Sequence, residues 1–391
     1  MSVTETTLFA TLPMILNVFF QMFVWGVISD RYQRRRTFII IGEVFAAVGT
    51  IFVFHTHRTV TSGVLAGWVI IIGLSLIEIF WSMSNTGWTA LISDLVPYEE
   101  RNKIQGNLSS MGGIGRIMGV WIGGLLYDGL EMYYEGWGFY EGILFYVAAG
   151  VMIISAIPMF FIPEGGIERL YQEEKSQEID IQNGNKNSAF LIFLIAMMLI
   201  NFGRNSVAIL LSLYLSLEEG FNVSSQVLSY IINTQSLAII LIGIFLGWIS
   251  SKLGTRRTLI FGAFIAIFSL IMFSTITSLP LIYVASFLRG CADVIISASS
   301  YTYASRLINP KNRARYFGYY NTTFFLSWGL AGTLIVGPAT DLLILSGIGV
   351  VIAHKLSFLL AAGITTIGIL ILMVMVRYFN QHSVESIIHT T

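Results

Sequence analysis

The sequence has little charge, a single cysteine and no recognisable catalytic motif. Charged residues make up only 11% of the 391 residues and hydrophobic residues 55%, whereas a soluble domain carries roughly 25% charged residues. This balance excludes a soluble enzyme. The lone Cys291 excludes a disulfide framework. Because the sequence contains no Walker loop, metal-ligand cluster or nucleophile–base arrangement, we expect no cofactor, no metal and no enzymatic activity.

The sequence does contain many long apolar stretches. A membrane-spanning helix needs about 20 mostly apolar residues, and eleven stretches meet this requirement. They lie near residues 11–29, 37–54, 64–92, 103–126, 142–162, 189–217, 226–250, 258–277, 279–305, 314–337 and 356–377. The expected fold class is therefore an all-α membrane protein. The first stretch is not a signal peptide, because Glu5 precedes it and basic residues follow it.

The basic residues predict how the chain is oriented in the membrane. When alternate loops are assigned to the cytoplasm, starting with the loop at 30–36, most of the 22 Lys and Arg residues fall on that side. Basic residues concentrate on the cytoplasmic side of membrane proteins. We therefore expect a multi-pass protein of the plasma membrane with a cytoplasmic C-terminus and an external Met1. Its partners would be the lipid bilayer and a small-molecule substrate, with no nucleic acid.

Two loops recur along the chain and indicate an internal duplication. Gly26–Arg36 and Gly247–Arg257 both place a glycine and several basic residues between apolar stretches. Pro97–Arg101 and Pro310–Arg313 form a second matching pair in the same order. Since both copies keep the same membrane orientation, the two halves are parallel repeats related by an axis along the membrane normal.

The duplication predicts two helical bundles. We expect an N-terminal bundle over 1–162, a cytoplasmic linker over 163–188, a C-terminal bundle over 189–380 and a cytoplasmic tail over 381–391. The second copy of the repeated loop follows two apolar stretches of its half, whereas the first copy follows only one. We therefore expect eleven helices, five plus six, of a twelve-helix design that lacks its first helix here.

The loop at 26–36 resembles the Gly-x-x-x-Asp-Arg-x-Gly-Arg-Arg signature of the major facilitator superfamily, with Gln33 where glycine is usual. The resemblance extends over essentially the whole chain and implies the fold of that superfamily. It also implies that Asp30 caps a neighbouring helix and that Asp30, Arg34 and Asp94 form a cytoplasmic gate. Simple anchoring by positive charge is the alternative. The gating residues implied by the resemblance are Gly26, Asp30, Arg31, Arg34, Arg35, Asp94, Gly247, Lys252 and Arg256.

A glycine pattern in the stretch 103–126 resembles the fifth-helix motif of superfamily exporters that exchange substrate for protons. Val120 occupies the position of a proline in that motif. The glycines of the pattern are Gly106, Gly115, Gly119, Gly123 and Gly124. Glycines at such spacing also let helix backbones approach closely in lipid. Helix packing without any antiport role therefore stays open.

Ionisable residues inside apolar stretches mark the candidate site, because charge within a membrane is unfavourable and points to function. Three stretches carry polar residues at three- and four-residue spacing, around Glu78, Arg204 and Asp293. The resemblance places these three helices around a central cavity. The candidate residues for substrate or protons are Glu78, Asn85, Arg116, Asn201, Arg204, Gln235, Arg289 and Asp293.

Position along the helices predicts which of these charges meet. Glu78 and Arg116 are almost equally far from the loop that joins their helices, so they are expected at one level. Asp293 can pair either with Arg289, one turn away, or with Arg204 across the cavity. We hypothesise that Glu78 and Asp293 carry protons, while Arg204 and Arg289 hold them or bind an anionic group. Static ion pairs that fix helix contacts are the alternative.

Three functions stay open. The leading interpretation is a monomeric secondary transporter that works by alternating access and exports small organic or drug-like solutes in a proton-coupled cycle. The first alternative is a sugar or organic-anion symporter or uniporter, which the three arginines within apolar stretches favour. The second alternative is a non-transporting, receptor-like or defective relative of such transporters.

Overall fold

The computed structural model describes residues 3–127, 133–134, 137–166, 183–223, 225–309 and 312–388. This part of the chain is helical throughout apart from its turns and loops, and it contains no strand. Within it, nine helices are long and apolar enough to cross a membrane. The other two predicted stretches form α5 and α13, which are helical but rich in glycine and polar residues. The expected fold class is therefore observed, while the count of eleven spans stays a prediction.

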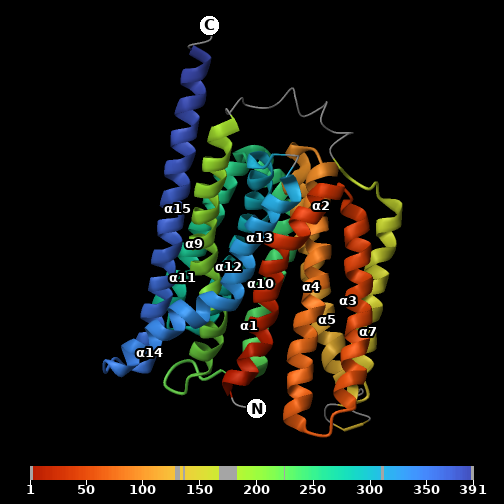
Figure 1. Cartoon of the computed structure of the whole chain (residues 1–391). Coiled ribbons are helices and arrows are strands. Elements are labelled where there is room, and N and C mark those ends of the chain that lie inside the picture. Colours follow the sequence, from red (N-terminus) through yellow and green to blue (C-terminus); the bar gives the residue numbers. More distant parts are fainter. Residues whose placement is uncertain are drawn as a thin grey trace. The chain divides into compact units, whose positions relative to one another are not determined.

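The chain divides into two compact units. Unit 1 consists of residues 1–96, 118–173 and 309–325. Its elements are α1 (Val3–Phe20), the π-helix η1 (Gln21–Trp25), α2 (Gly26–Tyr32), α3 (Arg35–Arg58), α4 (Gly63–Leu95), α6 (Trp137–Tyr140), α7 (Ile143–Ala156) and the 3₁₀ helix η2 (Ile157–Phe161). Helix α4 packs against α1 and α3, and α3 also packs against α7, as Figure 1 shows. Phe54, Ile77 and Phe145 lie at the centre of this packing.

Unit 2 consists of residues 97–117, 174–308 and 326–391. Its elements are α9 (Asn183–Ser216), α10 (Ser225–Leu253), α11 (Thr255–Thr275), α12 (Leu279–Leu307), the π-helix η4 (Gly332–Val336), α14 (Gly337–Leu345) and α15 (Val350–Ile388). Helix α12 packs against α10 and α11, and α15 packs against α9 and α11. Tyr214, Phe273 and Phe358 belong to a buried apolar cluster of this unit.

Two helices are divided between the two units, and the predicted bundles over 1–162 and 189–380 stay a prediction. The first part of α5 (Tyr98–Tyr127) belongs to unit 2, and the first part of α13 (Arg313–Ala331) belongs to unit 1. Close backbone contact explains both placements, because a Cβ at Gly106 would overlap the carbonyl oxygen of Gly243, and one at Gly318 would lie 2.6 Å from that of Gln21. The absence of a side chain at these glycines allows the approach.

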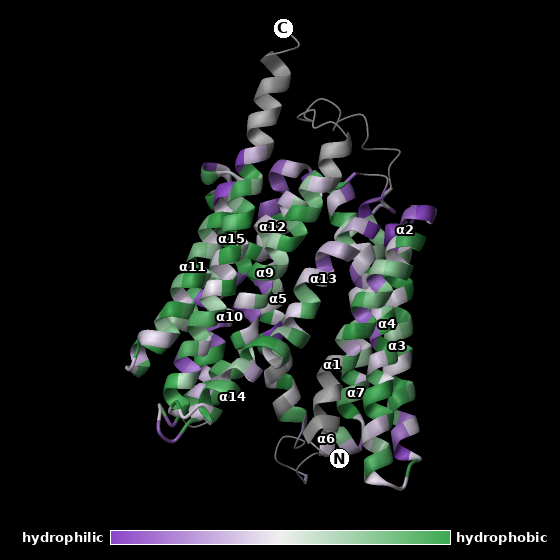
Figure 2. Ribbon diagram, turned by 60° about the vertical axis from the view of Figure 1, so that its left-hand side comes forward, coloured by the Kyte–Doolittle hydropathy of each residue, from purple (hydrophilic) through white to green (hydrophobic). Residues whose placement is uncertain are grey.

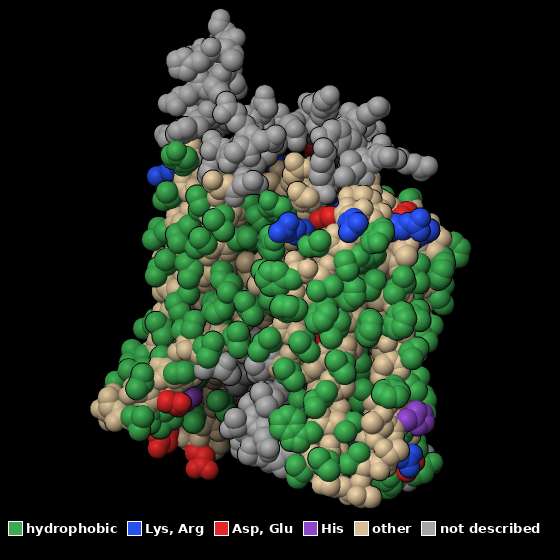
Figure 3. All heavy atoms as spheres, viewed as in Figure 1, with side chains coloured by type: hydrophobic (Ala, Val, Ile, Leu, Met, Phe, Trp, Pro, Cys, Tyr) green, Lys and Arg blue, Asp and Glu red, His purple; other side chains and the backbone are tan. Residues whose placement is uncertain are grey.

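The surfaces of the helices are largely apolar. On α3 and α4, large exposed side chains include Phe45, Phe52 and Leu65. Figure 2 shows hydrophobic residues along most of α3 and α4 and hydrophilic residues at α2, and hydrophobic side chains cover much of the face seen in Figure 3. Exposed apolar surface of this extent is typical of a protein that contacts other apolar matter. A bilayer provides such surroundings.

The predicted linker and tail fall only partly within the described residues. Of the linker 163–188, residues 167–182 lie outside them, and α9 already begins at Asn183. Of the tail 381–391, residues 389–391 lie outside them, while α15 extends to Ile388.

Candidate functional site

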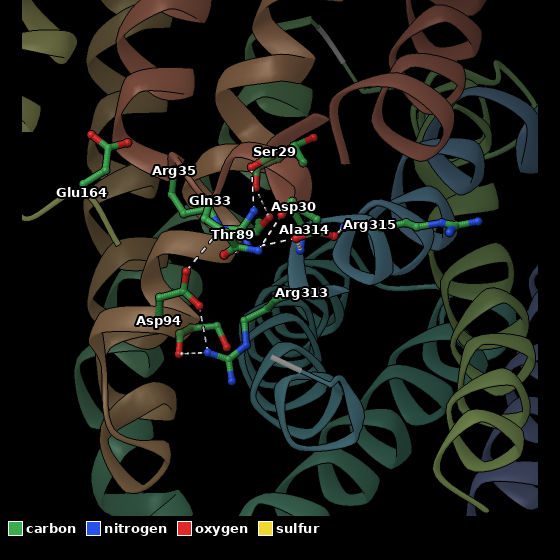
Figure 4. Close-up of polar contacts among 12 residues, drawn as sticks. Ser29, Asp30, Gln33, Arg35, Thr89, Asp94, Glu164, Arg313, Ala314 and Arg315 are labelled. Carbon is green, nitrogen blue, oxygen red and sulfur yellow. Dashed lines mark hydrogen bonds and ion pairs between the residues drawn. The ribbon is translucent and has the colours of Figure 1, made fainter. Parts of the chain in front are cut away.

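Asp30, in the last turn of α2, accepts hydrogen bonds from the first turn of α13. The backbone N–H of Ala314 donates to Oδ1 at 2.9 Å and that of Arg315 donates to Oδ2 at 2.8 Å, as Figure 4 shows. The first N–H groups of a helix have no acceptor within the helix and form the positive end of its dipole. The Asp30 carboxylate therefore satisfies two donors and complements the α13 dipole. Gly26 makes room for this contact, since a Cβ there would lie 2.7 Å from Arg315 Cα.

Arg35, the first residue of α3, connects Asp30 to Asp94. Its Nη2 lies 2.8 Å from Asp30 Oδ1 and its Nε lies 3.2 Å from Asp94 Oδ2. Its Nη1 donates to Ser29 Oγ at 2.8 Å. The Arg35 side chain is fully buried, so nearly all of its charge is balanced within the protein. A guanidinium suits this position because its planar fork of donors can contact several acceptors at once.

Arg313 completes a buried cluster of four charges. Its Nη1 lies 2.9 Å from Asp94 Oδ1 and donates to Ser93 O at 2.9 Å. Asp94 and Arg313 are each 5% exposed. Two carboxylates and two guanidiniums thus balance each other where α2, α3, α4 and α13 meet. We call Asp30, Arg35, Asp94 and Arg313 the four-charge cluster.

The structure differs from the expected gate in which arginine it uses. Arg34, expected to bind Asp94, is exposed, and so is Arg31. The reason is the turn between α2 and α3, where Gln33 has a φ of 52° and Arg34 lies outside both helices. Gln33 occupies the position that is usually glycine, and it adopts the left-handed conformation that glycine favours. Its side-chain Nε2 donates to Asp30 O at 2.6 Å, which supports this turn.

Glu164 is a partner of α3 that the sequence did not suggest. Its carboxylate accepts from Thr37 N at 3.0 Å, from Thr37 Oγ1 at 3.0 Å and from Arg36 Nε at 3.2 Å. It therefore caps the start of α3. Glu164 lies in the segment predicted as a linker, so only the tertiary structure reveals this contact.

The second copy of the repeated loop makes contacts of a different kind. A Cβ at Gly247 would lie 2.7 Å from Lys103 Cβ, which places the start of α5 against α10. Asn102 Nδ2 donates to Thr255 Oγ1 at 2.8 Å and also to Ser250 Oγ. These partners are neutral, unlike the carboxylates of the first copy. Lys252 lies over the Trp248 ring, with its Nζ 4.4 Å from the ring centre, and Arg256 lies beside Tyr303.

The glycines of α5 have different surroundings among the described residues. Gly106 lies against α10, but a Cβ at Gly115, Gly119 or Gly123 would meet nothing within 4 Å there. Gly124 lies in α5, and the structure does not describe its surroundings. Close helix contact is thus observed at the first glycine of the pattern, and the role of the other glycines stays a prediction.

Glu78 lies at the end of a chain of amide side chains in unit 1. Asn321 Nδ2 donates to Gln21 Oε1 at 2.8 Å, Gln21 Nε2 donates to Asn17 Oδ1, and Asn17 Nδ2 donates to Glu78 Oε1. The three amides are buried. These three amides were not predicted from the sequence, although Asn17 and Gln21 are spaced one helical turn apart within an apolar stretch. Arg116 is exposed and belongs to unit 2, so its expected meeting with Glu78 stays a prediction.

Asp293 of α12 is held by two helices of unit 2. Arg204 Nη1 of α9 forms an ion pair with Oδ1, and Gln235 Nε2 of α10 donates to Oδ2 at 2.5 Å. Asn201 Oδ1 in turn accepts from Arg204 Nε at 3.0 Å. Gly290 allows this arrangement, because a Cβ there would overlap the carbonyl oxygen of Gln235 and push α10 away from α12.

Of the two arginines predicted as alternative partners of Asp293, Arg204 forms the ion pair. Asp293 also acts electrostatically on Arg289. Arg289 is 8% exposed, and its Nε has no acceptor among the described residues. Asn85 is half-buried on α4. The candidate site residues therefore gather in two places, around Glu78 in unit 1 and around Asp293 in unit 2.

Comparison with known families identifies the chain. Residues 1–332 match the Major Facilitator Superfamily, and residues 193–387 match it again. The chain belongs to this superfamily. It is therefore an integral membrane protein and a transporter of the superfamily, in line with the apolar helices and the internal repeat.

The individual proteins that this chain resembles share low sequence identity with it. The chain is 22% identical over 306 residues to the "Multi-drug resistance efflux pump PmrA homolog" of Lactococcus lactis, covering 76% of this chain and 69% of that protein. It is 27% identical over 183 residues to the "Cis,cis-muconate transport protein" of Acinetobacter baylyi, covering 44% and 42%. Among solved structures, the human organic anion transporter MFSD10 (TETRAN) superposes with a TM-score of 0.71 at 14% identity, covering 94% and 83%.

Proposed function

We propose that this superfamily member exports small organic solutes across the plasma membrane in exchange for protons. The observation that carries the proposal is the placement of Glu78 and Asp293, two carboxylates inside membrane-spanning helices and in different units. Ionisable residues at such depth are typical of proton pathways in transporters. The similarity to a multidrug efflux pump homologue supports the export direction.

Glu78 suits proton exchange because its partner is an amide. Asn17 donates to the carboxylate in the observed arrangement. An asparagine side chain carries both a donor and an acceptor, so a rotated Asn17 can accept from a protonated Glu78. Both protonation states of Glu78 thus have a hydrogen-bond partner. We assign Glu78 as a proton carrier on this ground.

The four-charge cluster suits a gate in an alternating-access cycle. It attaches the start of α13 to α2, α3 and α4, although α13 follows the second-half helices in the sequence. Superfamily transporters work by rocking one bundle against the other. We propose that the cluster is intact in one state of the cycle and separates in the other. As for any allosteric coupling, its contribution to the equilibrium would be on the order of 1–3 kcal/mol.

The test uses purified protein in liposomes with an imposed pH gradient. We expect a fluorescent organic dye, for example ethidium, to move against its gradient toward the side from which protons flow. Glu78→Gln should abolish this uphill movement but leave exchange of labelled for unlabelled dye in place, because exchange needs no net proton transfer. Wild-type protein that moves dye equally with and without the pH gradient would contradict the proposal.

Organic-anion transport is a second candidate, favoured by the excess of positive charge around Arg204, Arg289 and Asp293. The names of the muconate transport protein and the organic anion transporter point the same way. The two candidates differ in a direct assay. Liposomes loaded with labelled cis,cis-muconate would lose it in a protein-dependent way under the second candidate, while dye movement would not respond to protons.

A further inference from the structure

The interior of unit 2 contains more positive than negative charge. Arg204 on α9 and Arg289 on α12 are 5% and 8% exposed, and Asp293 is the carboxylate beside them. Both arginines lie within electrostatic range of each other and of Asp293. Two guanidiniums and one carboxylate leave one positive charge in excess within these membrane-spanning helices.

Asp293 supplies one negative charge for two arginines. Its oxygens accept from Arg204 and from Gln235, and it acts on Arg289 without a direct contact. Arg289, one turn away on the same face of α12, keeps a buried Nε donor with no acceptor among the described residues. A buried charge that is only partly compensated is unfavourable, and an anion from outside the protein would complete the compensation.

The neighbouring residues on α12 are more exposed than Arg289. The Asp293 side chain is 17% exposed, and Ser297, one turn further along α12, is half-buried. The polar face of α12 is therefore less enclosed beyond Arg289 than at Arg289 itself. A guanidinium offers two parallel N–H donors to a carboxylate, which makes this pair stronger and more directional than a single hydrogen bond.

We propose that Arg289 binds the carboxylate group of the transported solute, so that the substrates of this protein are small organic carboxylates. This inference rests on the proposed transport function and develops its second candidate, organic-anion transport, because it assigns the substrate class to the same transport site. Arg204 is the positioning residue beside it, since it forms the ion pair with Asp293 and leaves the charge of Arg289 only partly compensated. The anion then completes a charge balance that the helices of unit 2 lack by themselves.

Thermal stability of the full-length protein separates a ligand-binding arginine from a structural one. We expect benzoate to raise the Tm of wild-type protein in detergent, because a ligand that binds only the folded state stabilises it. The uncharged isostere benzamide and sodium chloride should not do so. Arg289→Met should have a Tm equal to or above that of the wild type without ligand, since it removes an uncompensated charge, and should lose the benzoate shift. Arg289→Lys should keep part of the shift.

Transport in liposomes supplies the second measurement. Arg289→Met should reduce benzoate flux by on the order of tenfold or more, the loss of one charge-assisted contact, whereas Arg377→Met on the exposed end of α15 should leave it unchanged. An Arg289→Met protein that keeps the benzoate shift and flux would overturn the proposal. A wild-type Tm raised equally by chloride would overturn it too, because the site would then bind inorganic anions. Proton-driven dye transport without any carboxylate binding would overturn this inference and leave the proposed function standing.

Discussion

Arg35 shows how a charged side chain is accommodated in the interior of this largely apolar protein. Its fully buried side chain contacts two carboxylates and a hydroxyl, each from a different position in the sequence. The exposed Arg34 lies next to it and has the same chemistry. Removal of one member of a buried ion pair leaves the other charge uncompensated, whereas removal of an exposed arginine changes the stability of the protein little. Position in the tertiary structure therefore separates two residues that the sequence treats alike.

This contrast predicts different effects of two adjacent substitutions. Arg35→Met should destabilise the protein by about 3–5 kcal/mol, the usual effect of breaking a buried ion pair, while Arg34→Met should change stability by less than about 0.5 kcal/mol. The buried Cys291 is the lone cysteine of the chain, so a thiol-reactive dye can report unfolding in a thermal ramp. Equal losses of Tm for the two variants would contradict the assignment of Arg35 to the cluster.

Gln33 provides a second prediction at this scale. Its φ of 52° is a conformation that costs most residues on the order of 1 kcal/mol relative to glycine. Gln33→Gly should therefore keep or raise the Tm, with the lost Gln33–Asp30 hydrogen bond offsetting part of the gain. Gln33→Val should lower the Tm, because a β-branched side chain fits this conformation poorly. A Gln33→Val protein as stable as the wild type would rule out the left-handed turn.

At the scale of helices, close backbone contacts determine which side chains meet. The lengths of most apolar stretches predicted the helices to within a few residues, as for 279–305 and α12 (Leu279–Leu307). Helix α15 (Val350–Ile388) instead extends well beyond the predicted 356–377. The contacts between helices were less predictable, because they depend on glycines that have no partner visible in the sequence. Gly290 shows this most clearly, since its contact with Gln235 brings that amide onto Asp293.

Substitution of Gly290 tests this dependence. Gly290→Ala should lower the Tm and reduce transport, because the new Cβ would collide with the Gln235 carbonyl oxygen and separate α10 from α12. The matched control is Gly363→Ala on α15, where a Cβ meets nothing within 4 Å among the described residues. The control should be neutral or stabilising, by up to about 1 kcal/mol, through helix propensity. A loss of Tm in the control as large as in Gly290→Ala would point to helix propensity rather than collision.

At the scale of the whole molecule, each of the two units contains one copy of the repeated loop, and the contacts of the two copies differ in charge. Unit 1 joins its loop to α13 through the four-charge cluster, whereas unit 2 joins its loop to α5 through amide and hydroxyl groups. Ionic contacts depend more strongly on partners and surroundings than neutral ones do. We therefore expect changes in the first loop to shift the transport cycle more than changes in the second loop.

The substrate class proposed above predicts a response to membrane potential. A negative charge moved across the membrane gains or loses about 2.3 kcal/mol per 100 mV. Export of a carboxylate should therefore speed up when the substrate side is made electrically negative with potassium and valinomycin. The flux of benzoate through protein-free liposomes provides the background. A protein-dependent benzoate flux that does not change with the potential would show that the carboxylate is not transported as an anion.

The sequence by itself determined the membrane class, the helices, the repeated loops and the residues whose charge lies inside the spans. Those features depend on hydrophobicity and spacing, which are local properties of the chain. Only the tertiary structure decided that Arg35 rather than Arg34 joins the cluster, that Glu164 caps α3, and that Asp293 pairs with Arg204. Such contacts depend on how helices approach one another, because the electrostatic energy of a buried charge is set by neighbours that can lie anywhere in the sequence.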